Sequence, residues 1–140
     1  MEAVLERVKS YEDLLVWQKS VDLVTEIYRV TSVFPRSETF GLTSQLRRSA
    51  VSIPSNIAEG QGRATKGEFI QFLGNARGSL FELRTQVLIA GKLSYLTGEC
   101  AGELTMQADR VGQLLNGLIR SLSGTHLKRN TNHQTRSTSL

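Results

Sequence analysis

Apolar residues recur along this chain with helical spacing, and no stretch shows the strict alternation that is typical of a half-buried strand. Four such patterns predict helices over residues 14–34, 39–59, 65–96 and 98–122. Short links between successive helices favour neighbours that run in opposite directions. The hydrophobic pattern therefore predicts an all-α protein, an antiparallel up-down-up-down four-helix bundle.

The last two predicted helices carry the clearest packing signal, because their apolar residues alternate steps of four and three. This heptad spacing is typical of the seam in left-handed bundle packing. The seam residues are Phe69, Leu73, Ala76, Leu80, Leu83, Val87 and Ala90 in one helix, and Leu104, Ala108, Val111, Leu115, Leu118 and Leu122 in the other. Local signals mark the helix starts: Asp13 and Thr97 as caps, and Thr65 with Glu68 at the spacing of a capping box.

A second surface, away from these seams, is rich in small and apolar residues. It comprises Gly74, Gly78, Phe81 and Leu88 in the third predicted helix, and Phe40, Val51 and Ala58 around the second. A glycine inside a helix costs about 1 kcal/mol relative to alanine, so Gly74 and Gly78 suggest close approach of another backbone. Either the second and third helices pack closely within one bundle, or these residues form a subunit interface. The broad apolar surface of the first helix favours self-association.

Length and charge agree with one small domain. The 140 residues are 39% hydrophobic, enough for a single core. We expect a short N-terminal extension over residues 1–10, the bundle over 11–124, and a flexible, basic, polar tail over 125–140. The net charge is +4, of which the segment from Ser123 onward supplies +3 and the rest only +1. The basic character is therefore partly a property of the tail.

Residues 45–63, QLRRSAVSIPSNIAEGQGR, carry more polar side chains than a bundle requires. Gln45, Ser49, Ser52 and Asn56 follow the edge of the core stripe, which predicts a buried polar network or a hydrogen-bond ladder between helices. Basic residues in and near this segment are candidates for binding phosphate groups of nucleic acid. The candidates are Arg47, Arg48, Arg63, Lys66 and Arg77, with Lys128 and Arg129 in the tail. The alternative is a solvated or ion-paired surface.

The residues that most enzyme mechanisms need are missing from the predicted helices. Both histidines, His126 and His133, lie in the tail, so the Glu-x-x-His pairs of a di-iron bundle are absent. Cys100 has no neighbouring histidine, and no glycine-rich loop is followed by Gly-Lys-Ser or Gly-Lys-Thr. The sequence therefore predicts no enzyme, no cofactor, no metal site and no small-molecule substrate.

The sequence gives no signal for a membrane or for secretion. No apolar run approaches the length of a membrane-spanning helix, and the N-terminal residues lack an apolar signal core. Cys100 is the only cysteine, which excludes a disulfide within the chain and suits a reducing compartment. We therefore expect a cytoplasmic protein.

Several segments resemble the bacterial four helix bundle protein family, also called the 23S rRNA intervening-sequence protein or S23 family. The strongest are VWQK at 16–19, FP at 34–35, QLRRSAVSIPSNIAEG at 45–60 and ARGSLFEL at 76–83. The resemblance extends from about Tyr11 to Leu122 and excludes the tail.

The resemblance implies an antiparallel bundle that assembles into rings, typically homopentamers, without enzymatic activity. Some members of the family are encoded within inserts in 23S rRNA genes. Related bundles are accessory variability determinants of diversity-generating retroelements, basic pentamers that bind a reverse transcriptase and its RNA template. We therefore expect a non-catalytic oligomer that binds structured RNA, with a reverse transcriptase as a further expected partner. The alternative is a protein–protein interaction scaffold without nucleic-acid binding.

Overall fold

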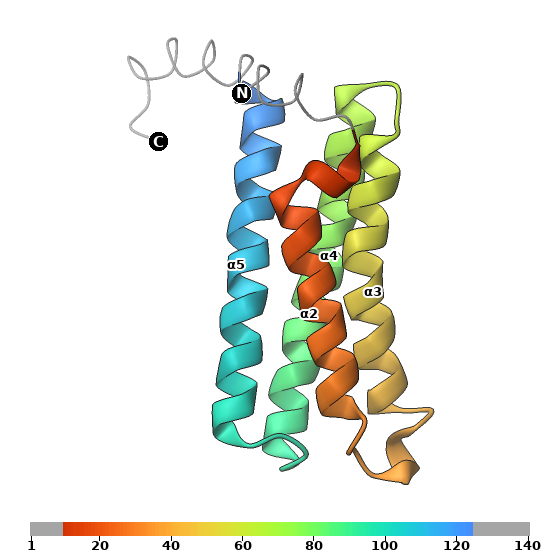
Figure 1. Cartoon of the computed structure of the whole chain (residues 1–140), viewed down its shortest axis with the longest axis vertical. Coiled ribbons are helices and arrows are strands. Elements are labelled where there is room, and N and C mark those ends of the chain that lie inside the picture. Colours follow the sequence, from red (N-terminus) through yellow and green to blue (C-terminus); the bar gives the residue numbers. More distant parts are fainter. Residues whose placement is uncertain (1–9, 125–140) are drawn as a thin grey trace, which may run out of the picture.

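A computed structural model describes residues 10–124, and within them the chain forms a bundle of four α-helices (Figure 1). The helices are α2 (Leu15–Thr31), α3 (Leu42–Gln61), α4 (Lys66–Lys92) and α5 (Gly98–Leu122), with two short 3-10 helices, η1 (Tyr11–Asp13) and η2 (Arg36–Glu38). Successive helices run antiparallel and pack together, and α5 also packs against α2. The predicted up-down-up-down bundle is confirmed. The predicted tail and all of the predicted extension except Ser10 lie outside the described residues.

The core lies along the axis of the bundle, where the predicted seams meet. Every predicted seam residue of α4 is buried, and in α5 only Leu118 is half-buried against the core. On α2, Leu23 and Ile27 are buried, whereas a second apolar stripe, formed by Trp17, Val24 and Tyr28, is partly covered and leaves Tyr28 exposed. A helix in a four-membered ring has two neighbours and buries one face, so the wide apolar arc of α2 is only partly covered.

The predicted helix ends differ from the observed ends by at most four residues. Asp13 does not cap α2 as predicted. It belongs to η1, where it closes a capping box with Ser10. The N-cap of α2 is Leu14, which offers no side-chain hydrogen bond. At its other end α2 stops at Thr31, three residues before Phe34, because the chain turns towards η2.

The largest difference is at the end of α4, which stops at Lys92 instead of Leu96. Ser94 has a φ of 63°, in the left-handed region. The N–H of Tyr95 donates to the carbonyl of Ala90 at 2.9 Å, and the N–H of Ser94 donates to Gly91 at 3.0 Å. This pair of bonds is a Schellman motif with serine at the position that glycine usually occupies.

The N-caps predicted for the last two helices are present, although Glu68 accepts from the Thr65 hydroxyl instead of completing a capping box. The Thr65 hydroxyl accepts from the Glu68 N–H at 3.1 Å, and the Thr97 hydroxyl accepts from the Cys100 N–H at 3.1 Å. The start of α3 is held differently, by a carboxylate that precedes it. Glu38 accepts from the Leu42 N–H at 3.0 Å and from the Tyr95 hydroxyl at 2.9 Å.

The α3–α4 pair is the most closely packed part of the bundle. Gly60 is buried, and a Cβ at this position would lie 2.7 Å from the Cβ of Phe72. Above this close approach, small polar side chains replace apolar ones between the two helices. These polar side chains form part of the outer surface of the α3–α4 seam.

Candidate nucleic-acid interface

The predicted polar ladder is confirmed for Ser49, Ser52 and Asn56, and it joins α3 to α4, whereas Gln45 is exposed and takes no part in it. The Ser49 hydroxyl donates to Oε1 of Gln86 at 2.7 Å, and the hydroxyls of Ser52 and Ser79 are 2.8 Å apart. Asn56 donates from Nδ2 to the Ser52 hydroxyl at 3.0 Å. Ser49 and Gln86 are both buried. Because these groups bond to each other, the seam tolerates polar side chains without leaving a buried atom unsatisfied.

The ladder forms the floor of a groove of about 500 Å³ along the outside of the α3–α4 seam. All the residues that line this polar groove are polar: Gln45, Arg48, Ser49, Ser52, Ser79 and Glu82. The sequence indicated the α3 side of this groove but not Ser79, Glu82 or Gln86. Ser79 and Gln86 are seven residues apart beside the α4 seam, which is the spacing that would have paired them with the α3 ladder.

Two of the predicted phosphate-binding residues are engaged between helices. Arg47 of α3 donates from Nε to the Thr31 hydroxyl at 2.9 Å, and its guanidinium lies 4.5 Å from the centre of the Tyr28 ring on α2. Arg77 of α4 donates from Nη1 to Oδ1 of Asn116 on α5 at 3.0 Å. Both guanidinium groups therefore stabilise the bundle.

Arg63 and Lys66 come together at one end of the bundle. They line a hollow of about 210 Å³ with Leu122, the last residue of α5. Arg63 pairs with Glu59 at 2.8 Å and lies over the Phe72 ring. The segment with Lys128 and Arg129 follows this end in sequence but lies outside the described residues. Of the predicted cations within residues 10–124, Arg63 and Lys66 share a site, whereas Arg47, Arg48 and Arg77 lie on other sides of the bundle.

The predicted interface residues are mostly at the surface. A Cβ on Gly74 or Gly78 would meet no other atom within 4 Å, so the close-packing interpretation is wrong for these two glycines. Phe81 is 54% exposed and Leu88 is 59% exposed on the same side of α4. We call these four residues the α4 stripe. The remaining predicted interface residues are Phe40, which is 97% exposed, Val51, which is exposed, and Ala58, which is half-buried.

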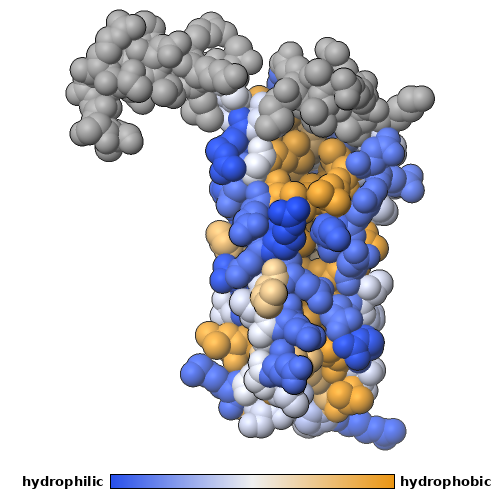
Figure 2. Space-filling view, turned by 60° about the vertical axis from the view of Figure 1, so that its left-hand side comes forward, coloured by the Kyte–Doolittle hydropathy of each residue, from blue (hydrophilic) through white to orange (hydrophobic). Residues whose placement is uncertain are grey.

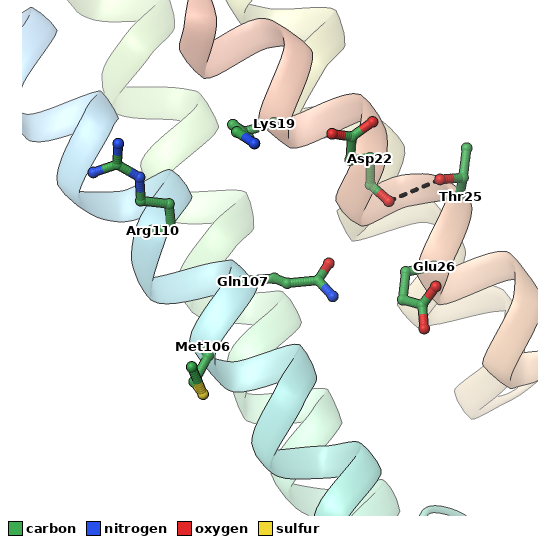
Figure 3. Close-up of a pocket in the computed structure, with 7 residues that line it drawn as sticks. All are labelled: Lys19, Asp22, Thr25, Glu26, Met106, Gln107 and Arg110. Atoms are coloured by element: carbon green, nitrogen blue, oxygen red, sulfur yellow. Dashed lines mark hydrogen bonds between the residues drawn. The ribbon is translucent and has the colours of Figure 1, made fainter.

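A further hollow, of about 650 Å³, lies between α2 and α5, on the opposite side of the bundle from the polar groove. Figure 3 shows its lining residues: Lys19, Asp22, Thr25 and Glu26 from α2, and Met106, Gln107 and Arg110 from α5. Two bases and two acids offset each other here. Bonding to Arg29 lowers the pKa of Glu26, which therefore stays ionised and is a poor general acid.

Two observations on the described side chains bear on metal binding and on nucleophilic catalysis. Within residues 10–124, no three His, Cys, Asp or Glu side chains form a group that could hold a metal ion. Burial raises the pKa of the Cys100 thiol, which disfavours the nucleophilic thiolate. Figure 2 shows hydrophobic patches interspersed with hydrophilic residues over one face. In the described part of the chain, every helix is too short or too polar to cross a membrane.

The comparisons with known proteins agree with the resemblance found in the sequence. Residues 12–117 match the family described as 23S rRNA-intervening sequence protein. Among solved structures, the bundle is similar to a protein of unknown function from the S23 ribosomal protein family of Bacteroides thetaiotaomicron, with a TM-score of 0.69 and 23% identity. That match covers 76% of this chain and 99% of the other, and it supports the fold alone. No curated protein matches the sequence.

Proposed function

Because the chain belongs to the 23S rRNA-intervening sequence protein family, we propose that it is a non-catalytic, oligomeric bundle that binds structured RNA in the cytoplasm. The observation that carries this proposal is that Arg63 and Lys66 lie close together at the end of the bundle where α5 stops. The chain continues from there into a segment with Lys128, Arg129 and Arg136 and no acid. Clustered cations of this kind bind phosphate groups without reading sequence.

The pairing of Arg63 with Glu59 does not prevent phosphate binding. Both side chains are substantially exposed, and an exposed ion pair contributes little net free energy. A phosphate can therefore replace the carboxylate and accept two hydrogen bonds from the guanidinium. Arg47 and Arg77 are less suited to this role because interhelical contacts hold them. We accordingly assign the phosphate contacts to Arg48, Arg63, Lys66, Lys128 and Arg129.

Self-association would strengthen such a modest basic site by repeating it. Several linked copies of a weak site bind one RNA far more tightly than a single copy does. The exposed α4 stripe, together with Phe40 and Val51, supports a contact between copies of this chain. The family likeness adds a pentamer and a reverse transcriptase partner to the proposal.

Binding of an RNA hairpin across a salt series tests the proposal. The double variant Arg63→Gln, Lys66→Gln removes two cations, and we expect the slope of log affinity against log salt to become shallower by roughly 1.5 to 2. The matched control, Lys19→Gln with Arg110→Gln, removes two cations from the α2–α5 hollow and should leave the slope nearly unchanged. Absence of RNA binding by the wild type at low salt would contradict the proposal.

The second candidate is a protein–protein scaffold that does not bind nucleic acid. The contacts of Arg47 and Arg77 within the bundle favour it, because they leave fewer cations for RNA. Charge reversal at Arg47 and Arg48 discriminates between the candidates. If the protein is a scaffold, these changes should alter the mass of the assembly in sedimentation experiments, and the wild type should not bind RNA.

A further inference from the structure

We propose that the polar groove between α3 and α4 binds a ribose-phosphate unit, with Arg48 on the phosphate and Glu82 on the ribose hydroxyls. This inference rests on the proposed function, which selects a ribose-phosphate among the ligands that carry both an anion and hydrogen-bond donors. It assigns a specific RNA contact to a surface other than the Arg63 and Lys66 end.

The floor of the groove is fixed and satisfied before any ligand arrives. Ser49 is held by Gln86, and Ser52 is held by Ser79 and Asn56. Side chains locked by their own hydrogen bonds lose little conformational freedom when a ligand binds. The floor therefore offers preorganised hydroxyl groups, and its role does not require rearrangement of α3 or α4.

The rim, in contrast, carries side chains that are unused within the described bundle. Gln45, Arg48 and Glu82 are exposed, and their side chains make no hydrogen bond or ion pair with another residue in the range 10–124. Arg48 on α3 and Glu82 on α4 line the same groove without pairing with each other. Two opposite charges that share a hollow but stay apart can both contact one ligand placed between them.

The chemistry of this rim narrows the ligand. A bare anion would be repelled by Glu82, and a simple amine would be repelled by Arg48. An apolar segment would take these polar side chains out of water without offering them hydrogen-bond partners. A ribose-phosphate satisfies both charges, because its phosphate accepts from a guanidinium and its hydroxyls donate to a carboxylate, as in many nucleotide sites. The volume of about 500 Å³ lies within the usual range for a small-ligand pocket.

Isosteric variants of the full chain test the two roles, with an RNA hairpin and the DNA hairpin of the same sequence as probes. Arg48→Gln should weaken RNA binding about three- to tenfold and make the salt slope shallower by about one. Glu82→Gln removes a negative charge, so DNA binding should strengthen slightly. The same change should lower the preference for RNA over DNA about threefold, because the 2′-hydroxyl loses a charged acceptor. The matched control is Arg110→Gln on the opposite seam.

The ribose-phosphate could belong to a free nucleotide or to an RNA strand, and titration with uridine 5′-monophosphate distinguishes the two. Saturable binding that Arg48→Gln abolishes assigns the groove to a free nucleotide, and binding of the hairpin alone assigns it to an RNA strand. Thermal melts that match the wild type show that each variant is folded, as we expect for exposed side chains.

Three results would overturn the inference. RNA binding that is equally affected by Arg48→Gln and Arg110→Gln would show a diffuse charge effect, while the proposed function would stand. If Arg48→Gln or Glu82→Gln changed the mass of the assembly without changing RNA binding, the groove would be covered by a second copy of the chain. Failure of the wild type to bind either the hairpin or the monophosphate at low salt would remove the proposed function and this inference together.

Discussion

The double variant Gly74→Ala, Gly78→Ala should stabilise a single bundle and weaken contact between bundles. Neither added Cβ would meet another atom within 4 Å, so the change carries no steric penalty inside the protomer. Each alanine then gains about 0.8 to 1 kcal/mol of helix propensity, and the pair gains about 1.5 to 2 kcal/mol. For a domain of this size, that gain raises the melting temperature by roughly 4 to 8 °C.

The effect on association has the opposite sign if the α4 stripe is an interface. Two methyl groups would hold an approaching backbone away or force it to shift, which costs about 1 to 3 kcal/mol in a well-packed contact. That cost corresponds to a roughly 5- to 150-fold larger dissociation constant. Urea unfolding at several protein concentrations measures stability, and sedimentation velocity measures mass. The concentration series is needed because association itself adds apparent stability.

Gly60→Ala is the matched control for this reasoning. Its Cβ would lie 2.7 Å from the Cβ of Phe72, so overpacking outweighs the propensity gain and the variant should be less stable than the wild type. If the Gly74 and Gly78 variant were also destabilised, the open positions of these glycines would be refuted. If it were stabilised with unchanged mass at every concentration, the α4 stripe would not be a subunit interface.

Three further changes probe the bundle. Ser94→Gly should raise the free energy of unfolding by about 0.5 to 1 kcal/mol in urea, because glycine adopts the φ of 63° without strain. Arg47→Ala should lower it by about 1 to 2 kcal/mol in the same assay, through loss of the contacts with Thr31 and Tyr28. The N–H of the first α3 residue and the Tyr95 hydroxyl lower the pKa of Glu38 below its ordinary 4.5. Its stabilising contribution is therefore complete above pH 4.5 and lost as the pH falls through the lower folded value. In thermal melts between pH 6 and pH 3, the melting temperature of Glu38→Gln should therefore fall less than that of the wild type.

The local parts of the fold were predictable because their causes lie close together in the sequence. The α4 and α5 seams follow from heptad spacing, and the Thr65 and Thr97 caps follow from a hydroxyl three residues before an unpaired N–H. The end of α4 was not predictable in the same way. A serine at position 94 gives no signal for the left-handed turn that glycine would have marked.

The directions in which the arginine side chains point could be predicted only with the packing of the whole bundle. Successive residues on a helix are rotated by about 100°, so Arg47 contacts α2 while Arg48 lines the seam with α4. The sequence pattern shows this divergence but not which helix lies on each side. Likewise, Ser79 and Glu82 acquire a role only when the antiparallel register places them opposite Ser52 and Arg48.

The polar groove and the α4 stripe are neighbours, and this proximity links the two proposals. Gly78 belongs to the stripe and Glu82 to the groove, and residues four apart on a helix are neighbours on its surface. A copy that packs on the stripe would place its own surface beside the groove and repeat the groove around the assembly. Phe81→Ser, which changes no charge, should therefore weaken both self-association and RNA binding, with the salt slope falling as fewer grooves engage one RNA. Weaker association with undiminished RNA affinity would show that the two surfaces act independently.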